Sequence, residues 1–167
     1  MEAIWLSEDA AATLVCEAER TLPNETGGLL LGYIARRDTV PVILEATTAG
    51  PLAVSTPYSY EPDQEYDVQI ALARHRHSKG TVRYLGDWHS HAHGASYLSV
   101  RDRRVLKDLG RSAGAQLKSP VMLVVGGFPR AVICAWAWAP LSVLPFVRRM
   151  RSISLRTFEP DTRYVDG

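Results

Sequence analysis

Apolar residues recur at two spacings along the chain, and each spacing predicts its own kind of element. Alternation of apolar and polar residues, or a short unbroken apolar run, predicts strands at 27–33, 40–47, 82–88, 121–125 and 132–138. Helical spacing predicts helices at 8–21, 65–78 and 99–112. Because helices alternate with hairpin-forming strands, the expected fold class is α+β (mixed α/β), with a central mixed β-sheet flanked by helices in a single domain.

Some segments carry little periodic signal. Residues 49–63 contain three prolines among small polar residues, so we expect a loop with little regular structure, of the kind that often serves function. Arg37-Asp38 is expected to form a turn between two strands. The domain itself is expected to span residues 1–150, followed by a C-terminal tail at 151–167.

The most apolar stretch, residues 121–146, is long enough on paper to span a bilayer. Pro129, Arg130 and Pro140 interrupt it, so two strands joined by a turn explain it better. The N-terminus has an early acid and lacks the basic and apolar regions of a secretory signal. We therefore expect a cytoplasmic protein with no membrane partner.

Composition and charge exclude several classes. With 19 basic and 18 acidic residues, the 167-residue chain has a formal net charge of +1, which gives no bulk attraction to nucleic acid. The basic cluster at 148–151 is expected to be a solvated face or edge. Two cysteines cannot make a disulfide framework; Cys16 is expected in the core of the first helix and Cys134 packed in a strand.

The five histidines are confined to residues 75–93. His89 and His91 are separated by one residue at the end of an expected strand, where alternate side chains point to the same side. Asp102 lies on the following helix, three residues after Ser99. Two imidazoles and one carboxylate form a suitable three-ligand set for catalytic zinc, with the fourth position left for water.

Such a site also requires a base. Glu25 is a candidate because Gly27 and Gly28, which follow it, allow that segment to approach another backbone closely. Taken alone, Glu25 would be an ordinary surface acid. The downstream histidines are what single it out.

This set resembles the JAMM motif of the JAB/MPN metalloprotease family: a Glu, then His-Ser/Thr-His, seven residues, and Ser-x-x-Asp. The resemblance implies that Glu25 is the catalytic glutamate and that His89, His91 and Asp102 are the zinc ligands. Ser99 matches the serine that helps to stabilise the reaction intermediate. The likeness extends over about residues 6–139 and includes the segments 26–32 and 86–88.

One position departs from the family pattern. Ala92 follows the second histidine where the family usually has proline, which should leave the loop freer, and His93 adds an imidazole near the mouth of the site. We expect His93 to be a solvated loop residue, with contact to substrate or to an adventitious metal as the alternative. His75 and His77 are expected at a solvated helix end, where i and i+2 side chains diverge. The pair Ser99 and Asp102 also fits a helix-capping box, which is compatible with metal binding.

The activity implied by the resemblance is zinc-dependent hydrolysis of a peptide or isopeptide bond at the C-terminal tail of a ubiquitin-like protein joined to a target or precursor. The substrate would be a ubiquitin-like protein or its conjugate, with E1/E2-like conjugation proteins as further partners, and bacterial relatives include deconjugases of antiphage systems. Two alternatives stay open: hydrolysis of a small amide or processing of a sulfur-carrier protein, and a non-catalytic MPN-type scaffold.

Overall fold

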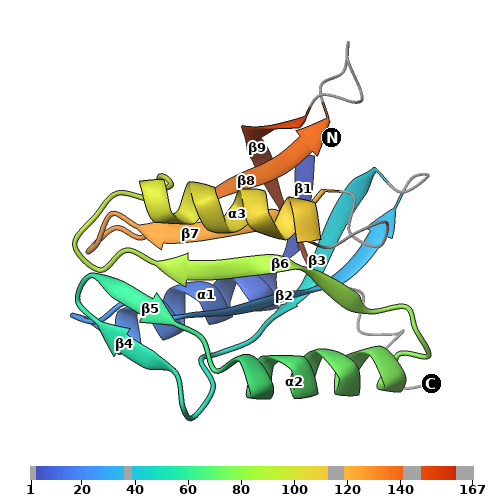
Figure 1. Ribbon diagram of the computed structural model, residues 1–167, viewed down its shortest axis with the longest axis horizontal. Helices are drawn as coiled ribbons and strands as arrows, with labels where there is room; N and C mark the ends of the chain where they lie inside the picture. The colour runs from blue at the N-terminus through green and yellow to red at the C-terminus, as the bar shows by residue number, and fades with distance from the viewer. Residues whose placement is uncertain (1–2, 36–38, 113–118, 141–147, 161–167) are drawn as a thin grey trace.

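The computed structural model describes residues 3–35, 39–112, 119–140 and 148–160, and seven of its strands form one closed mixed sheet (Figure 1). The order within this sheet is β1-β3-β2-β6-β7-β8-β9. The described strands are β1 (Ala3–Ser7), β2 (Gly27–Ala35), β3 (Val40–Ala46), β4 (Val54–Thr56), β5 (Ser59–Glu61), β6 (Arg83–Ser90), β7 (Val121–Gly126), β8 (Val132–Pro140) and β9 (Arg148–Phe158). The helices are α1 (Glu8–Arg20), α2 (Gln64–His77) and α3 (Val100–Ser112). The expected class and the three expected helices are confirmed.

The sheet closes through its first and last strands. β1 pairs in parallel with β9, with Trp5 opposite Arg156, and on its other side β1 pairs in parallel with β3. The boundary expected after residue 150 therefore falls inside β9, so residues 151–158 belong to the sheet and not to a tail. The expected turn at 37–38 and the end of the tail, 161–167, lie outside the described residues.

Helix α1 packs against the inner face of the closed sheet. Ser7 is its N-cap and accepts a hydrogen bond from the Ala10 amide at 3.1 Å, while Ala10, Leu14 and Ala18 are buried in the main core. The expectation for Cys16 is wrong, because its side chain is exposed. The buried residues recur every four positions, so Cys16 faces away from the sheet.

Strand β7 is buried on both faces, which explains its unbroken apolar sequence. Leu123 and its alternate neighbours join the core around α1, whereas Met122 and Val124 pack with Leu106 beneath α3 on the outer side (Figure 1). As far as residue 140 the apolar run thus forms two strands of the sheet, as expected, and its remainder lies outside the described residues. None of the helices in the described ranges is both long and apolar enough to cross a membrane.

Residues 49–63 contain more regular structure than their prolines suggest. Strands β4 and β5 pair in an antiparallel hairpin, with Thr56 opposite Ser59 around the turn at Pro57 and Tyr58. The expectation of an irregular loop is therefore wrong for this part. The hairpin lies beside the end of β6 in Figure 1, and His89 is in the last two residues of that strand. Asp63, just after the hairpin, is the N-cap of α2 and accepts a hydrogen bond from the Leu52 amide at 3.0 Å.

Buried acidic groups lie where α2 covers β6. Asp67 is 8% exposed, and among the described residues its Oδ1 has no hydrogen-bond partner. Burial, together with the nearby charge of Asp63, raises the pKa of Asp67 to about 6. Burial likewise raises the pKa of Asp87 to about 6, although the Tyr84 hydroxyl donates a hydrogen bond to this carboxylate at 2.8 Å. Ionised Asp67 therefore costs stability at neutral pH.

We predict that Asp67→Asn stabilises the protein at pH 7.5 by up to about 3 kcal/mol, since a shift of one pKa unit corresponds to about 1.4 kcal/mol. The pKa of Asp67 is higher in the folded protein than in the unfolded chain. Deprotonation of Asp67 therefore leaves the free energy of unfolding unchanged below about pH 4 and lowers it as the pH rises to about 6. Denaturant unfolding of both proteins should be measured across pH 4–8. The free energy of unfolding of the variant should increasingly exceed that of the wild type up to about pH 6, and the difference should be constant above it. Glu65→Gln, at an exposed acid of the same helix, should change little. A variant less stable than wild type at pH 7.5 would contradict the prediction.

Candidate metal centre

Two strands position the candidate site. β2 and β6 are antiparallel neighbours, with Gly27 opposite His89 and Gly28 opposite Trp88. A Cβ atom on Gly27 would lie 2.5 Å from the Trp88 carbonyl oxygen and 2.6 Å from the Tyr60 ring. Only glycine therefore allows this approach. It brings the segment that carries Glu25 to the end of β6.

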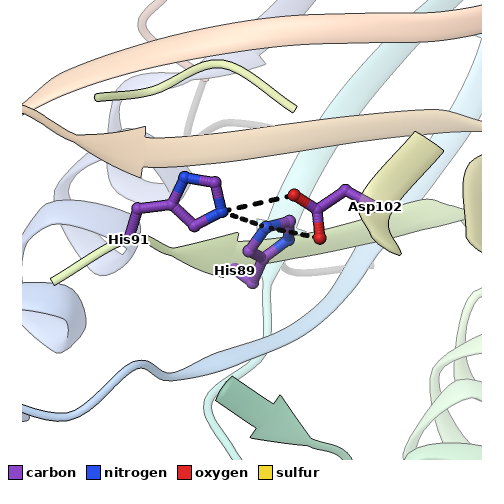
Figure 2. Close-up of side chains that lie close together, drawn as sticks. All are labelled: His89, His91 and Asp102. Carbon is purple, nitrogen blue, oxygen red and sulfur yellow. Dashed lines mark hydrogen bonds and ion pairs between the residues drawn. The ribbon is translucent and has the colours of Figure 1, made fainter. Parts of the chain in front are cut away.

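Three side chains converge where β6 ends and α3 begins. The Nε2 atoms of His89 and His91 lie 3.0 Å apart, and each lies 3.3 Å from one carboxylate oxygen of Asp102 (Figure 2). Each of the three side chains is 13% exposed. The structure brings the three predicted ligands together, because their potential ligand atoms all lie within 4.8 Å of one another.

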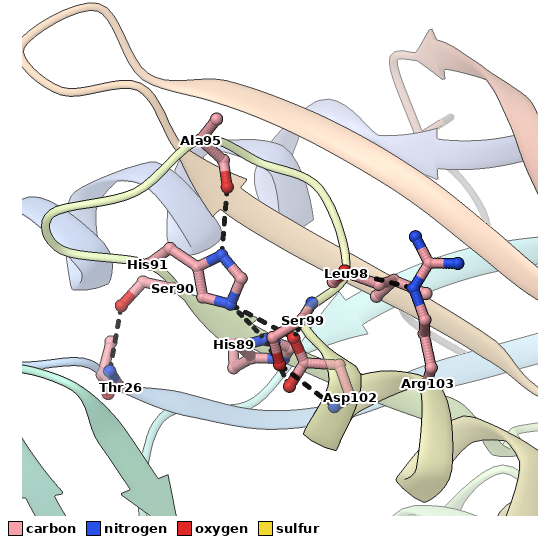
Figure 3. A network of polar contacts seen from close by, with 9 residues as sticks. All are labelled: Thr26, His89, Ser90, His91, Ala95, Leu98, Ser99, Asp102 and Arg103. Carbon is pink, nitrogen blue, oxygen red and sulfur yellow. Dashed lines mark hydrogen bonds and ion pairs between the residues drawn. The ribbon is translucent and has the colours of Figure 1, made fainter.

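The loop after His91 fixes the orientation of its ring. The His91 amide donates to the Val125 carbonyl at 2.8 Å, and ring atom Nδ1 lies 3.0 Å from the Ala95 carbonyl oxygen (Figure 3). A carbonyl can only accept, so Nδ1 carries a hydrogen and Nε2 is the ring nitrogen that faces the site. The Gly94 carbonyl accepts a hydrogen bond from the Gly127 amide, and the Ala92 side chain is buried. These contacts hold the loop that lacks the usual proline.

Ser99 and Asp102 form the expected capping box at the start of α3. The Ser99 amide donates to Asp102 Oδ2 at 2.7 Å, and the Asp102 amide donates to Ser99 Oγ at 3.2 Å (Figure 3). Burial acts to raise the pKa of Asp102, but hydrogen bonds from His89 and His91 outweigh it and hold that pKa well below its usual range. Asp102 is therefore an anion held rigidly against two imidazoles.

This arrangement fits a divalent metal ion. A tetrahedral zinc site with bonds near 2.0–2.1 Å has ligand atoms about 3.3 Å apart. The separations of 3.0–3.3 Å among His89, His91 and Asp102 match that spacing. Two imidazoles and one carboxylate also form the donor set of a catalytic site that keeps a position open.

Glu25 adjoins this centre. Its amide donates to the Thr56 carbonyl at 2.8 Å, which joins its segment to β4, and its side chain is half-buried. Burial raises the pKa of Glu25, while the neighbouring His91 and His89 act to lower it. A carboxyl group whose pKa is raised takes up a proton more readily, which suits a general base.

The other histidines lie outside the ligand cluster. His93 is exposed and contacts the Tyr58 ring, with centroids 5.7 Å apart, while His75 and His77 are exposed in the last turn of α2, as expected. Sequence reasoning missed two neighbours of the site: the hairpin that carries Tyr58, and Arg101, which forms a 3.6 Å ion pair with Glu61 of that hairpin. The Pro57-Tyr58 turn was the available signal for the hairpin.

Comparison with known families identifies this architecture. The family model described as prokaryotic homologs of the JAB domain matches residues 7–139. The chain belongs to this prokaryotic JAB family. The predicted resemblance is thereby confirmed. The roles of Glu25, Ser99 and the three ligands remain predictions made from the motif and the geometry.

Several relatives of the chain carry functional names. A Sinorhizobium fredii protein named "Probable metalloprotease y4qB" is 36% identical over 75% of this chain and 77% of its own length. A protein of Enterobacter hormaechei named "CD-NTase/cGAS isopeptidase" is 30% identical over 75% of this chain and 68% of its own. A Pseudomonas aeruginosa protein of the same name is 36% identical over 62% of this chain and 63% of its own length. These names support a peptidase or isopeptidase of the JAB family.

A solved structure supports the fold alone. Protein DSY2949 from Desulfitobacterium hafniense superposes with a TM-score of 0.69 over 96% of this chain and 97% of its own, at 18% identity. The overall fold of this chain therefore also occurs in a solved structure of distant sequence.

We predict that His91→Ala abolishes stoichiometric metal binding and that His93→Ala retains it. His91 contributes a converging Nε2 atom, whereas His93 lies two residues further along the same loop and contacts only the Tyr58 ring among the interactions described above. Metal analysis of purified protein and calorimetric titration with zinc measure the difference. Wild type and His93→Ala should bind about one ion per chain and gain thermal stability with it. Equal metal content in the two variants would contradict the assigned ligand set.

Proposed function

We propose that the protein is a zinc-dependent isopeptidase that cleaves the bond joining the C-terminal tail of a modifier protein to a target lysine. The observation that carries this proposal is the convergence of His89, His91 and Asp102 on one point, with the half-buried Glu25 beside them. A scaffold would require neither the complete ligand set nor the acid. The fit of the donor atoms to zinc and the names of the relatives support the same reading.

Zinc bound by these three side chains would act as a Lewis acid and lower the pKa of a water molecule toward neutrality. Glu25 takes the proton of the attacking water and passes it to the departing lysine amine, so that one carboxyl group serves as base and then as acid. Ser99 Oγ accepts a hydrogen bond from the Asp102 amide. Its own hydroxyl hydrogen can therefore be donated to the negative charge that develops on the carbonyl oxygen. The capping box thus fixes this donor in place.

The surface around the centre suits an extended, partly apolar peptide. Large apolar side chains are unusually exposed on both sides of it: Leu52, Val54 and Tyr58 on and beside the hairpin, and Tyr97 and Val100 at the start of α3. Exposed apolar residues gathered around a polar site commonly mark a binding surface. The short hairpin also offers a strand edge to which a tail could add by backbone pairing. A near-neutral chain has no need of bulk charge for this recognition.

Two kinds of modifier protein are candidates for the substrate. The JAMM resemblance favours a ubiquitin-like protein, whereas two relatives are named for CD-NTase/cGAS substrates. In both cases the bond would be an amide at a C-terminal tail. We therefore propose a protein modifier, with the two kinds of tail as separate substrates in the test.

We predict that Glu25→Gln lowers cleavage by about 10²–10⁴-fold, the usual contribution of general acid–base catalysis. The substrates are two isopeptide-linked fusions to a green fluorescent protein, in which a lysine side chain of that protein is joined to the C-terminal tail of a ubiquitin-like protein or to that of a bacterial CD-NTase. Wild type should release the fluorescent protein from at least one. Glu25→Gln should do so far more slowly with its metal content unchanged, because Glu25 is not among the ligands.

The matched control is Glu19→Gln, which neutralises an exposed acid of α1 and should cleave like wild type. Cleavage of neither fusion by metal-loaded wild type would overturn the isopeptidase proposal. Full activity of Glu25→Gln would remove its role as the base. Wild-type hydrolysis of small amides without cleavage of either fusion would favour an amide hydrolase instead.

We predict that Ser99→Ala lowers kcat by about 10²–10³-fold, the effect of losing one donor to an oxyanion. It should also cost about 1 kcal/mol of stability, because Ser99 caps α3. Ser7→Ala separates these effects, since Ser7 caps α1 from within the core. It should reduce thermal stability and leave kcat unchanged. A similar fall in kcat for both variants would show that the loss at Ser99 reflects stability alone.

A further inference from the structure

We infer that Ser90 is a positioning residue, whose hydroxyl sets the place of Glu25 relative to the metal ligands. Ser90 lies between His89 and His91 in the sequence, and its side chain is fully buried. It is not one of the converging ligands and does not touch the reacting atoms. This inference rests on the proposed function, because it concerns the geometry of the proposed base.

The backbone pairing of β2 with β6 changes character at Ser90. Gly27 and His89 are the last paired residues of the regular ladder. One residue further, the Ser90 amide donates to the Thr26 carbonyl at 2.8 Å, as a strand residue would. The Thr26 amide, however, donates to the Ser90 hydroxyl oxygen at 2.9 Å (Figure 3). A side chain therefore makes the final link between the two strands.

This substitution of a side chain for a backbone carbonyl has a geometric reason. β6 ends at Ser90, and the next amide, that of His91, donates to the Val125 carbonyl of β7 on the other side of the strand. A Ser90 hydroxyl can still reach the Thr26 amide while the backbone departs. The same residue thus allows His91 to join the ligand set and keeps the Glu25-Thr26 segment attached to β6.

The Glu25 segment is held from two sides. Glu25 donates its amide to the Thr56 carbonyl of the hairpin, and the next amide, that of Thr26, donates to Ser90. Thr26 is fully buried, so without the Ser90 oxygen its amide would be unpaired in the interior, which is unfavourable. The segment would shift to find another acceptor, or it would be held to Ser90 only by the bond from the Ser90 amide to the Thr26 carbonyl. Either change displaces Glu25 while His89, His91 and Asp102 keep their own contacts.

The experiment compares Ser90→Ala, Ser90→Thr and Ser90→Cys with wild type on the tail fusion that wild type cleaves. Threonine keeps the hydroxyl acceptor. Cysteine keeps a similar shape but presents sulfur, a weak acceptor, which provides a folded variant if alanine destabilises the chain. Ser78→Ala is the matched control. The Ser78 hydroxyl also accepts a hydrogen bond from a backbone amide, that of Val82, but at a turn remote from the ligands.

We expect kcat to fall 10–100-fold in Ser90→Ala and at least threefold in Ser90→Cys, since a displacement of about 1 Å in a reacting group can cost about 10²-fold. KM should stay within about twofold, and metal content should remain one ion per chain. Ser90→Thr should restore kcat to within about threefold of wild type, and Ser78→Ala should match wild type.

The inference would be overturned by an unchanged kcat in folded Ser90→Ala or Ser90→Cys, or by a loss of metal that accounts for the fall in rate. Failure of Ser90→Thr to act better than Ser90→Cys would also overturn it, because the hydroxyl would then not be the feature that matters. Absence of cleavage by wild type would instead refute the proposed function itself, and the inference with it.

Discussion

The close antiparallel pairing of β2 with β6 is the constraint on which the candidate site depends. Gly27 lies opposite His89, and any side chain larger than hydrogen at Gly27 would meet the Trp88 carbonyl and the Tyr60 ring. Backbone contact here brings together an acid and two imidazoles that lie more than sixty residues apart in the sequence. Catalytic geometry is thus supported by the same hydrogen bonds that hold the sheet together, and these are more rigid than loop contacts.

The electrostatics of the centre follow from this packing. Asp102 is stabilised as an anion by two imidazoles and by the amide of Ser99, whereas burial raises the pKa of Glu25. Two carboxyl groups in one site are therefore driven in opposite directions by their surroundings. Such a division suits one carboxylate that remains charged to bind a cation and another that exchanges a proton.

The parts of this structure that the sequence predicts are those encoded locally. The His-x-His spacing at the end of a strand and the Ser-x-x-Asp cap of a helix each follow from a few neighbouring residues, and both occur in the structure. Cys16 was misplaced because α1 is rich in alanine, so its apolar pattern does not specify which side faces the sheet. The β4–β5 hairpin was missed because its strands have only three residues each. The pairing of β1 with β9 joins the two ends of the chain, and no local pattern encodes such a contact.

That terminal pairing also limits how the protein can be shortened. The region that matches the family ends at residue 139, yet the sheet is completed only by β9, which pairs with β8 on one side and β1 on the other. A chain cut at residue 139 would retain every candidate catalytic residue and expose the unpaired edges of two strands. Exposed edges invite pairing with other chains. Aggregation of such a fragment would therefore report on an open sheet and not on the chemistry of the site.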